Sequence, residues 1–219
     1  MAARKPHIEL LHLDCMEYMR TLPDKAFDLA IVDPPYGIDI NRSGRLVKEK
    51  GWAYKAWDQG VPSPDYFAEL GRVSNNQIIW GGNYFGLEPT RCFLIWDKEQ
   101  PEGVSFASCE LAWTSFDASA KTFYMRPQGE DRIHPTQKPV ALYRWLLQNY
   151  AKPGQRILDT HLGSGSIAIA CDIEGFDLVG CEIDADYIAA ARKRLADHQA
   201  QPRMFEAPKE HPKQLEIDQ

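Results

Sequence analysis

Four consecutive residues, Asp33-Pro34-Pro35-Tyr36, directly follow the largely apolar segment Phe27–Val32, which is predicted to be a strand. The carboxyl end of a buried parallel strand is where open α/β sheets bind their ligands. Two prolines stiffen the backbone, so the Asp33 carboxylate and the Pro34 carbonyl can be held as fixed hydrogen-bond acceptors beside the flat ring of Tyr36. Two acceptors and a stacking surface suit a planar base that bears an exocyclic amine. A tight strand-to-loop turn is the alternative, because Asp-Pro-Pro can form one unaided.

A second group of residues has the pattern of a strand, a glycine turn and a helix start. The turn carries Gly163 and Gly165, and Glu182 follows Gly163 by 19 residues, at the end of the next apolar run. Glycines let a ligand approach the backbone closely, and an acidic residue at this distance can bind a ribose diol. The pattern fits a dinucleotide as well as an adenosyl ligand. A plain glycine turn, which needs no ligand, is the third interpretation.

The segment His134-Pro135-Thr136-Gln137-Lys138-Pro139 lies just before a helical pattern. A helix N-terminus with a nearby Lys and a Thr hydroxyl is a good seat for a small carboxylate. A proline-punctuated helix start with a solvated Lys138 explains the segment equally well.

Residues 41–58 are polar and basic and lack an apolar period. The basic side chains of this loop are Arg42, Arg45, Lys48, Lys50 and Lys55. From residue 41 to residue 56 the only acidic residue is Glu49, and aromatic residues lie among the basic ones. Basic side chains neutralise phosphates and aromatic rings stack on bases, so the loop is predicted to face nucleic acid. A solvated loop is the alternative.

The composition is that of an ordinary globular protein, with 44% hydrophobic and 26% charged residues among 219. It excludes general disorder, collagen and coiled coil. No apolar run reaches the ~18 residues of a spanning helix, and the N-terminus lacks the apolar core of a secretory signal, so we expect a cytoplasmic protein with no membrane partner. The five cysteines are scattered and form no C-x-x-C pair, so they do not indicate a metal site. The net charge of −6 argues against a protein covered with nucleic acid, so a basic nucleic-acid surface would have to be a local groove.

The elements that must position these residues alternate between strands and helices, the pattern of an open, mostly parallel sheet. The length predicts one domain over residues 1–198, followed by a disordered tail at 199–219. The seven predicted strands are Ile8–Leu13, Phe27–Val32, Gln77–Trp80, Cys92–Trp96, Glu110–Thr114, Arg156–Leu158 and Asp177–Cys181. The predicted helices are Pro64–Val73, Val140–Tyr150, Ser166–Glu174 and Ala185–His198.

Together the three motifs resemble the signature of the amino-group DNA methyltransferases. Their order, with DPPY first and the glycine turn last, is similar to the permuted β class of that family. The resemblance implies an α/β, Rossmann-like methyltransferase fold with a mixed, mostly parallel seven-stranded sheet and a circularly permuted motif order. The glycine-turn strand would be first in the family's order, Asp177–Cys181 second and Ile8–Leu13 third. It also implies a bacterial, phage or prophage source.

The resemblance implies S-adenosylmethionine as cofactor and S-adenosylhomocysteine as product. Asp14, with Cys15 beside it, would contact the cofactor adenine, Glu182 its ribose, and Thr136 and Lys138 would lie near its carboxylate. The other implied cofactor-binding residues are Asp33, His134, Asp159, His161, Gly163, Ser164, Gly165 and Ser166. One departure is Thr160-His161, where the family usually has Pro-Phe. The turn is retained, but His161 replaces the Phe that packs beside the cofactor in the family.

The implied activity is methylation of the N6 amine of a flipped adenine in double-stranded DNA, with Asp33, Pro34, Pro35 and Tyr36 as catalytic residues. Residues 115–133 would form a short target-recognition segment, so the protein would have a relaxed site or act as a homodimer. The closest alternative is N4-cytosine methylation, although DPPY goes more often with adenine in the family. A nicotinamide-dependent oxidoreductase and a non-catalytic DNA-binding protein are more distant alternatives, and RNA is not excluded as a substrate.

Overall fold

Eight strands form one sheet in the computed structural model, which describes residues 4–38, 60–101, 103, 107–127 and 137–201. The strands are β1 Ile8–His12, β2 Phe27–Val32, β3 Ser74–Trp80, β4 Leu94–Asp97, β5 Cys109–Thr114, β6 Lys121–Tyr124, β7 Arg156–Asp159 and β8 Asp177–Glu182. Their order in space is β1-β8-β7-β2-β3-β5-β4-β6. The first five run parallel, β5 runs antiparallel to both of its neighbours, and β6 runs parallel to β4.

The two ends of the described chain lie side by side in this sheet. The N-terminal strand β1 pairs with the last strand β8, with Ile8 opposite Leu178 and His12 opposite Glu182. The strand order reverses between β7 and β2, which creates the crevice where open α/β sheets bind ligands. The arrangement confirms the predicted permutation. The glycine-turn strand β7, which is first in the family's order, lies between β8, which is second, and β2.

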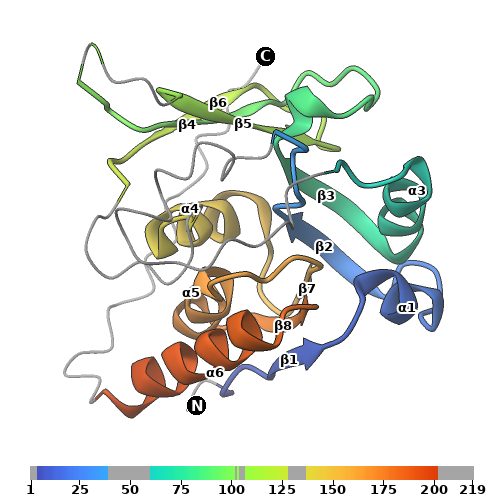
Figure 1. Cartoon of the computed structure of the whole chain (residues 1–219), viewed down its shortest axis with the longest axis vertical. Helices are drawn as coiled ribbons and strands as arrows, with labels where there is room; N and C mark the ends of the chain where they lie inside the picture. Colours follow the sequence, from blue (N-terminus) through green and yellow to red (C-terminus); the bar gives the residue numbers. More distant parts are fainter. Residues whose placement is uncertain (1–3, 39–59, 102, 104–106, 128–136, 202–219) are drawn as a thin grey trace.

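Helices cover both faces of the sheet (Figure 1). They are α1 Cys15–Arg20, α3 Pro64–Val73, the 3-10 turn η2 Gly82–Tyr84, α4 Val140–Tyr150, α5 Ser166–Glu174 and α6 Ala185–Ala200. Side chains of β2 alternate between the layers: Leu29 and Ile31 pack in the core under α4, α5 and α6, whereas Ala30 and Val32 pack in the core under α1 and α3. Burial on both faces explains why residues 29–32 of this strand are all apolar.

The prediction of seven strands was wrong by one, because β6 had not been expected. This four-residue edge strand, Lys-Thr-Phe-Tyr, is at most half-buried and pairs with β4, so its sequence carries little apolar signal. It lies inside the segment 115–133 that the resemblance assigns to target recognition. Helix α1 was also missed, since it has six residues of which only Met19 is buried.

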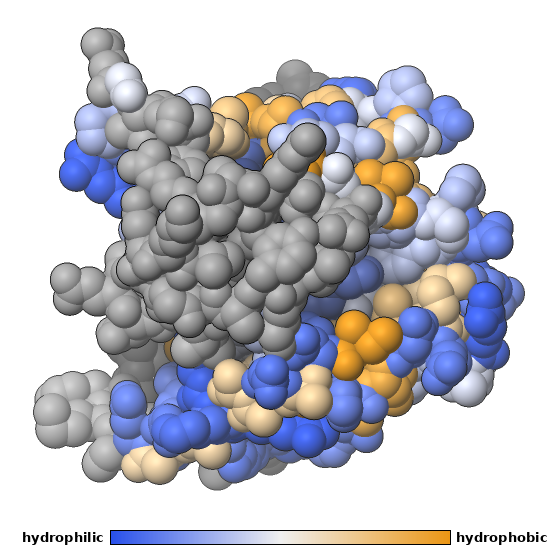
Figure 2. Space-filling view, viewed as in Figure 1, coloured by the Kyte–Doolittle hydropathy of each residue, from blue (hydrophilic) through white to orange (hydrophobic). Residues whose placement is uncertain are grey.

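Hydrophilic residues dominate the described surface seen in Figure 2, and apolar residues appear there as separate small patches. Within the described ranges, no helix combines the length and apolar character needed to cross a bilayer.

Candidate active site

Four acidic residues stand at the carboxyl ends of the four neighbouring parallel strands β1, β8, β7 and β2. They are Asp14, Glu182, Asp159 and Asp33 in the order of the strands in the sheet. Burial, reinforced by the charges of Asp33 and Glu182, raises the pKa of Asp159 to about 8. The sheet thus brings together acidic residues that lie far apart in the sequence, at the edge where a ligand is expected.

A cavity of about 140 Å³ opens beside the ends of β1, β7 and β8. Its lining residues are Leu13, Asp14, Cys15, Thr160, His161, Glu182 and Ile183. Apolar walls with carboxylates at the rim suit a flat base joined to a ribose, so the residues present fit the adenosine part of S-adenosylmethionine. Four predicted cofactor residues (Asp14, Cys15, His161 and Glu182) meet here, and Asp14 also caps α1 by accepting hydrogen bonds from the backbone N–H groups of Met16 and Glu17.

The glycine turn is held against Glu182 and α6. Gly163 and Gly165 adopt positive φ angles of 50° and 70°, and a Cβ on Gly165 would lie 2.9 Å from that of Ala191. Backbone N–H groups of Gly163 and Asp184 donate to the two carboxylate oxygens of Glu182, at 2.8 and 2.9 Å. The carboxylate is therefore fixed at the cavity rim, with lone pairs left for further donors.

Arg194 supports the same turn from α6, and sequence reasoning had not singled it out as a site residue. Its guanidinium donates to the Ser164 carbonyl at 3.0 Å and to the Ser166 hydroxyl at 2.8 Å. Ser164 and Ser166, both predicted to bind the cofactor, are buried. Nothing in the local sequence distinguishes Arg194 from the exposed Arg192 and Lys193 of the same helix.

His161 occupies the position that is usually Phe in the family's turn. Its Nδ1 lies 2.9 Å from the Thr160 hydroxyl, which in turn lies 2.6 Å from the hydroxyl of Tyr66. Burial lowers the pKa of His161 to about 4. At neutral pH the ring is therefore an uncharged wall of the cavity and is held by neighbouring hydroxyls.

The DPPY segment ends β2 with a hydrogen-bonded carboxylate. The hydroxyl of Tyr36 donates to Asp33 Oδ1 at 2.6 Å, and the ammonium of Lys138 lies 2.5 Å from Asp33 Oδ2. Lys138 is buried, and it also contacts Glu110 at 3.0 Å and the Tyr36 hydroxyl at 3.1 Å. The expected contact of Lys138 with the cofactor carboxylate stays a prediction. In the structure its ammonium lies beside the DPPY segment.

Two further charged residues complete this cluster and were missed by sequence reasoning. Glu110 lies on β5, and its other carboxylate oxygen pairs with Lys98 at 2.7 Å. Burial alone would raise the pKa of Glu110, but the charges of Lys138 and Lys98 lower it to about 2. No local signal could have found this pair, because its contact depends on the register of β4 with β5, in which Trp96 lies opposite Glu110.

The ring of Tyr36 is already stacked within the protein. Its centroid lies 5.1 Å from that of Tyr84, with the planes 16° apart. Gly81 has a φ of +72°, and a Cβ there would lie 2.2 Å from the Tyr36 ring, so this position needs glycine. The stacking of Tyr36 on a target base stays a prediction. The Tyr84 ring that stacks on Tyr36 in the structure is exposed.

Several predicted residues lie outside the described part of the chain. They are His134 and Thr136, the basic residues Arg42, Arg45, Lys48, Lys50 and Lys55, and the tail beyond residue 201. Among the described residues, no group of three or more His, Cys, Asp or Glu side chains could hold a metal ion.

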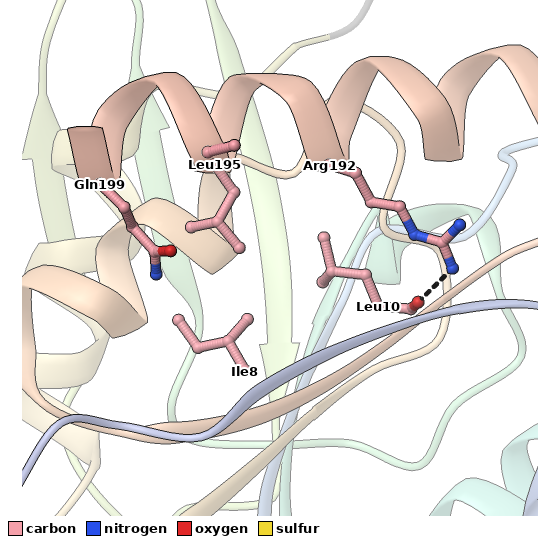
Figure 3. Close-up of a pocket in the computed structure, with 6 residues that line it drawn as sticks. Ile8, Leu10, Arg192, Leu195 and Gln199 are labelled. Carbon is pink, nitrogen blue, oxygen red and sulfur yellow. Dashed lines mark hydrogen bonds between the residues drawn. The ribbon is translucent and has the colours of Figure 1, made fainter.

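A larger cavity of about 240 Å³ lies between β1 and α6, away from the strand ends (Figure 3). Ile8, Leu10 and Leu195 form its apolar wall, and Arg192 donates to the Leu10 carbonyl at 2.7 Å. It contains none of the residues that the sequence singled out, so it is not part of the candidate active site.

Comparisons with known proteins agree with this geometry. Residues 95–193 match a family model described as DNA methylase. The type II methyltransferase M.HinfI of Haemophilus influenzae is 25% identical over 255 residues, which cover 90% of this chain and 70% of that protein. The M1.HpyAVI–SAM complex matches with a TM-score of 0.58 and 22% identity, covering 86% of this chain and 100% of that chain. The cytosine-N4-specific PvuII DNA methyltransferase matches with a TM-score of 0.59 and 12% identity, covering 93% of this chain and 92% of that one.

The strand order and the glycine turn at the switch point define a Rossmann-like methyltransferase fold of the kind that uses S-adenosylmethionine. Within that class the chain is related to the amino-group DNA methyltransferases, which act on adenine N6 or cytosine N4. The structural matches confirm the predicted fold, and the family match over residues 95–193 supports the predicted family and its cofactor. The oxidoreductase alternative leaves DPPY and HPTQKP unexplained.

Proposed function

We propose that this protein methylates the N6 amine of adenine in double-stranded DNA. The observation that carries the proposal is Asp33, whose carboxylate stands at the switch point of the sheet, next to the strand that leads into the glycine turn. An aspartate at the first motif position, where cytosine enzymes of the family more often have Ser, favours adenine over cytosine. Family members of both specificities share the fold, so the choice of base rests on this residue.

The chemistry follows from what Asp33 and Pro34 can accept. The exocyclic amine of adenine is a poor nucleophile, because its lone pair is delocalised into the ring. When bound, S-adenosylmethionine supplies a methyl group on a positively charged sulfur. The Asp33 carboxylate and the Pro34 carbonyl would accept the two amine hydrogens, which favours a pyramidal nitrogen with its lone pair free to attack. The nitrogen gains the methyl group and loses one proton to solvent, so catalysis consists mainly of positioning and electrostatics.

Two groups of residues would hold the two halves of the cofactor. Asp14, Cys15, His161 and Glu182 would enclose its adenosine in the cavity. The glycine turn with Asp159, and the segment that contains His134 and Thr136, would hold its methionine part. The acidic edge of the sheet also suits a ligand that carries a positively charged sulfur.

The base product distinguishes adenine from cytosine methylation. After incubation with duplex DNA and S-adenosylmethionine, we expect N6-methyladenine in the nucleoside digest, detected by mass spectrometry. The Asp33→Ala variant serves as the control for contaminating enzymes. N4-methylcytosine in its place would assign the alternative specificity, and the absence of both would reject DNA amine methylation.

DNA affinity should depend on the basic loop at 41–58, which we propose contacts phosphates. Replacing Arg42, Arg45 and Lys48 together with Ala should reduce the salt dependence of binding by roughly one unit of slope per lost phosphate contact. Fluorescence anisotropy at several salt concentrations measures this slope. Replacing Lys5, Lys152 and Lys193 together is the matched control for lost charge. A triple loop variant that binds and methylates like the unmodified protein would reduce the loop to a solvated surface.

A further inference from the structure

A chain of alternating charges runs from the DPPY segment across the sheet. Asp33 contacts Lys138, Lys138 contacts Glu110, and Glu110 contacts Lys98, with nitrogen–oxygen distances of 2.5, 3.0 and 2.7 Å. Each residue comes from a different part of the fold: the end of β2, the segment before α4, strand β5 and the segment after β4. The two carboxylates and two ammonium groups balance, so the cluster as a whole is neutral.

We propose that Glu110 is a positioning residue for methyl transfer: by sharing Lys138 with Asp33, it keeps the Asp33 carboxylate an effective acceptor for the target amine. This inference rests on the proposed function. Glu110 is not among the site residues that the sequence predicted.

The contacts of Lys138 support the proposal. Its side chain is 1% exposed, and its three ammonium hydrogens match its three partners: Asp33, Glu110 and the Tyr36 hydroxyl. The geometry therefore holds the ammonium between two carboxylates. Asp33 itself is 17% exposed and receives one donor at each oxygen, so it retains lone pairs for the amine.

Removing either neighbour of Asp33 should change its charge state in opposite directions. Burial raises the pKa of Asp33, the charge of Lys138 lowers it, and the charge of Glu110 raises it. The other groups that face Asp33 are Tyr36 on its own segment, Tyr143 on α4 and Asp159 on β7. Neither variant described below replaces them, but each removes one contact of the Tyr36 hydroxyl. Loss of Glu110 should thus lower the pKa of Asp33 and make it a weaker acceptor. Loss of Lys138 should raise that pKa.

The test compares Glu110→Gln and Lys138→Met with the unmodified protein. Single-turnover methylation of a DNA duplex is measured as a function of pH, and carbon-13 NMR follows the titration of the Asp33 carboxyl. Glu110→Gln should slow transfer roughly tenfold at neutral pH, leave S-adenosylhomocysteine affinity unchanged, and move the acid limb of the rate profile to lower pH. Lys138→Met should move that limb to higher pH. Glu174→Gln is the matched control, since Glu174 is 16% exposed and pairs with Arg144 at 2.6 Å, outside the site.

Three outcomes would overturn the inference: an Asp33 titration unchanged by Glu110→Gln, limb shifts of the same sign in both variants, or loss of transfer accompanied by equal loss of cofactor affinity and thermal stability. The last of these would assign Glu110 a purely structural role. If the unmodified protein transfers no methyl group, the proposed function fails, and the NMR titration still decides whether Glu110 and Asp33 are coupled through Lys138.

Discussion

Replacing Glu182 with Ala should weaken the binding of S-adenosylhomocysteine roughly tenfold to a hundredfold. Its carboxylate lies at the rim of the 140 Å³ cavity, where it can accept both ribose hydroxyls. Hydrogen bonds to a charged group are worth about 1.5–3 kcal/mol. The same carboxylate accepts the N–H groups of Gly163 and Asp184, so its loss also releases the glycine turn. Isothermal titration calorimetry measures the affinity directly.

Asp177 provides a matched control for Glu182 because it lies at the opposite end of β8. It too accepts a backbone hydrogen bond, from the N–H of His7 at 2.7 Å. Asp177→Ala removes a carboxylate from the same strand without touching the cavity, so it should leave the affinity unchanged. Equal affinities for the two variants and the unmodified protein would reject the assignment of Glu182 to the ribose.

Most of the sheet could be predicted because its strands carry strong local signals. Residues 29–32 are a continuous apolar run between Asp28 and Asp33, and the structure forms β2 over Phe27–Val32. Ser63 followed by Pro64 is a helix-start signal, and α3 begins at Pro64 and ends at Val73, as predicted. The glycine turn could also be predicted, because Gly163 and Gly165 have positive φ angles and glycine is the residue that adopts them most readily. The resemblance then placed β1 next to β8, which no local pattern could have done.

The parts of the site that could not be predicted depend on long-range register. Glu110 reaches Lys138 only because β5 runs antiparallel between β3 and β4. Tyr84 reaches Tyr36 because Gly81 turns the chain sharply after β3. Neither contact leaves a trace in residue spacing, because the partners lie 28 and 48 positions apart. Lys138 illustrates the same limit. Its position before α4 predicted either a seat for a small carboxylate or a solvated side chain, whereas its ammonium is buried against two carboxylates.

Asp33→Ala should reduce methyl transfer at least a hundredfold while leaving the protein folded. If Asp33 accepts an amine hydrogen mainly as the transition state forms, its loss affects rate more than binding. Removing one preorganised polar partner costs on the order of 10²–10³ in turnover. Lys138 would keep its contact with Glu110 in this variant, so no buried ammonium is left without a counter-charge. Glu182 and the glycine turn would retain most of the S-adenosylhomocysteine affinity, and DNA binding through the basic loop should persist.

Single-turnover methylation of an adenine-containing duplex, with cofactor affinity measured alongside, separates these effects. Asp33→Asn is the informative second variant. It keeps one acceptor oxygen, but it loses the charge that pairs with Lys138 and presents an NH₂ donor, so it should also transfer poorly. The control is Asp24→Asn, an exposed aspartate paired with Arg72 outside the site, which should transfer at the normal rate. Near-normal transfer by Asp33→Ala would overturn the acceptor mechanism, because the Pro34 carbonyl alone would then be sufficient to orient the amine.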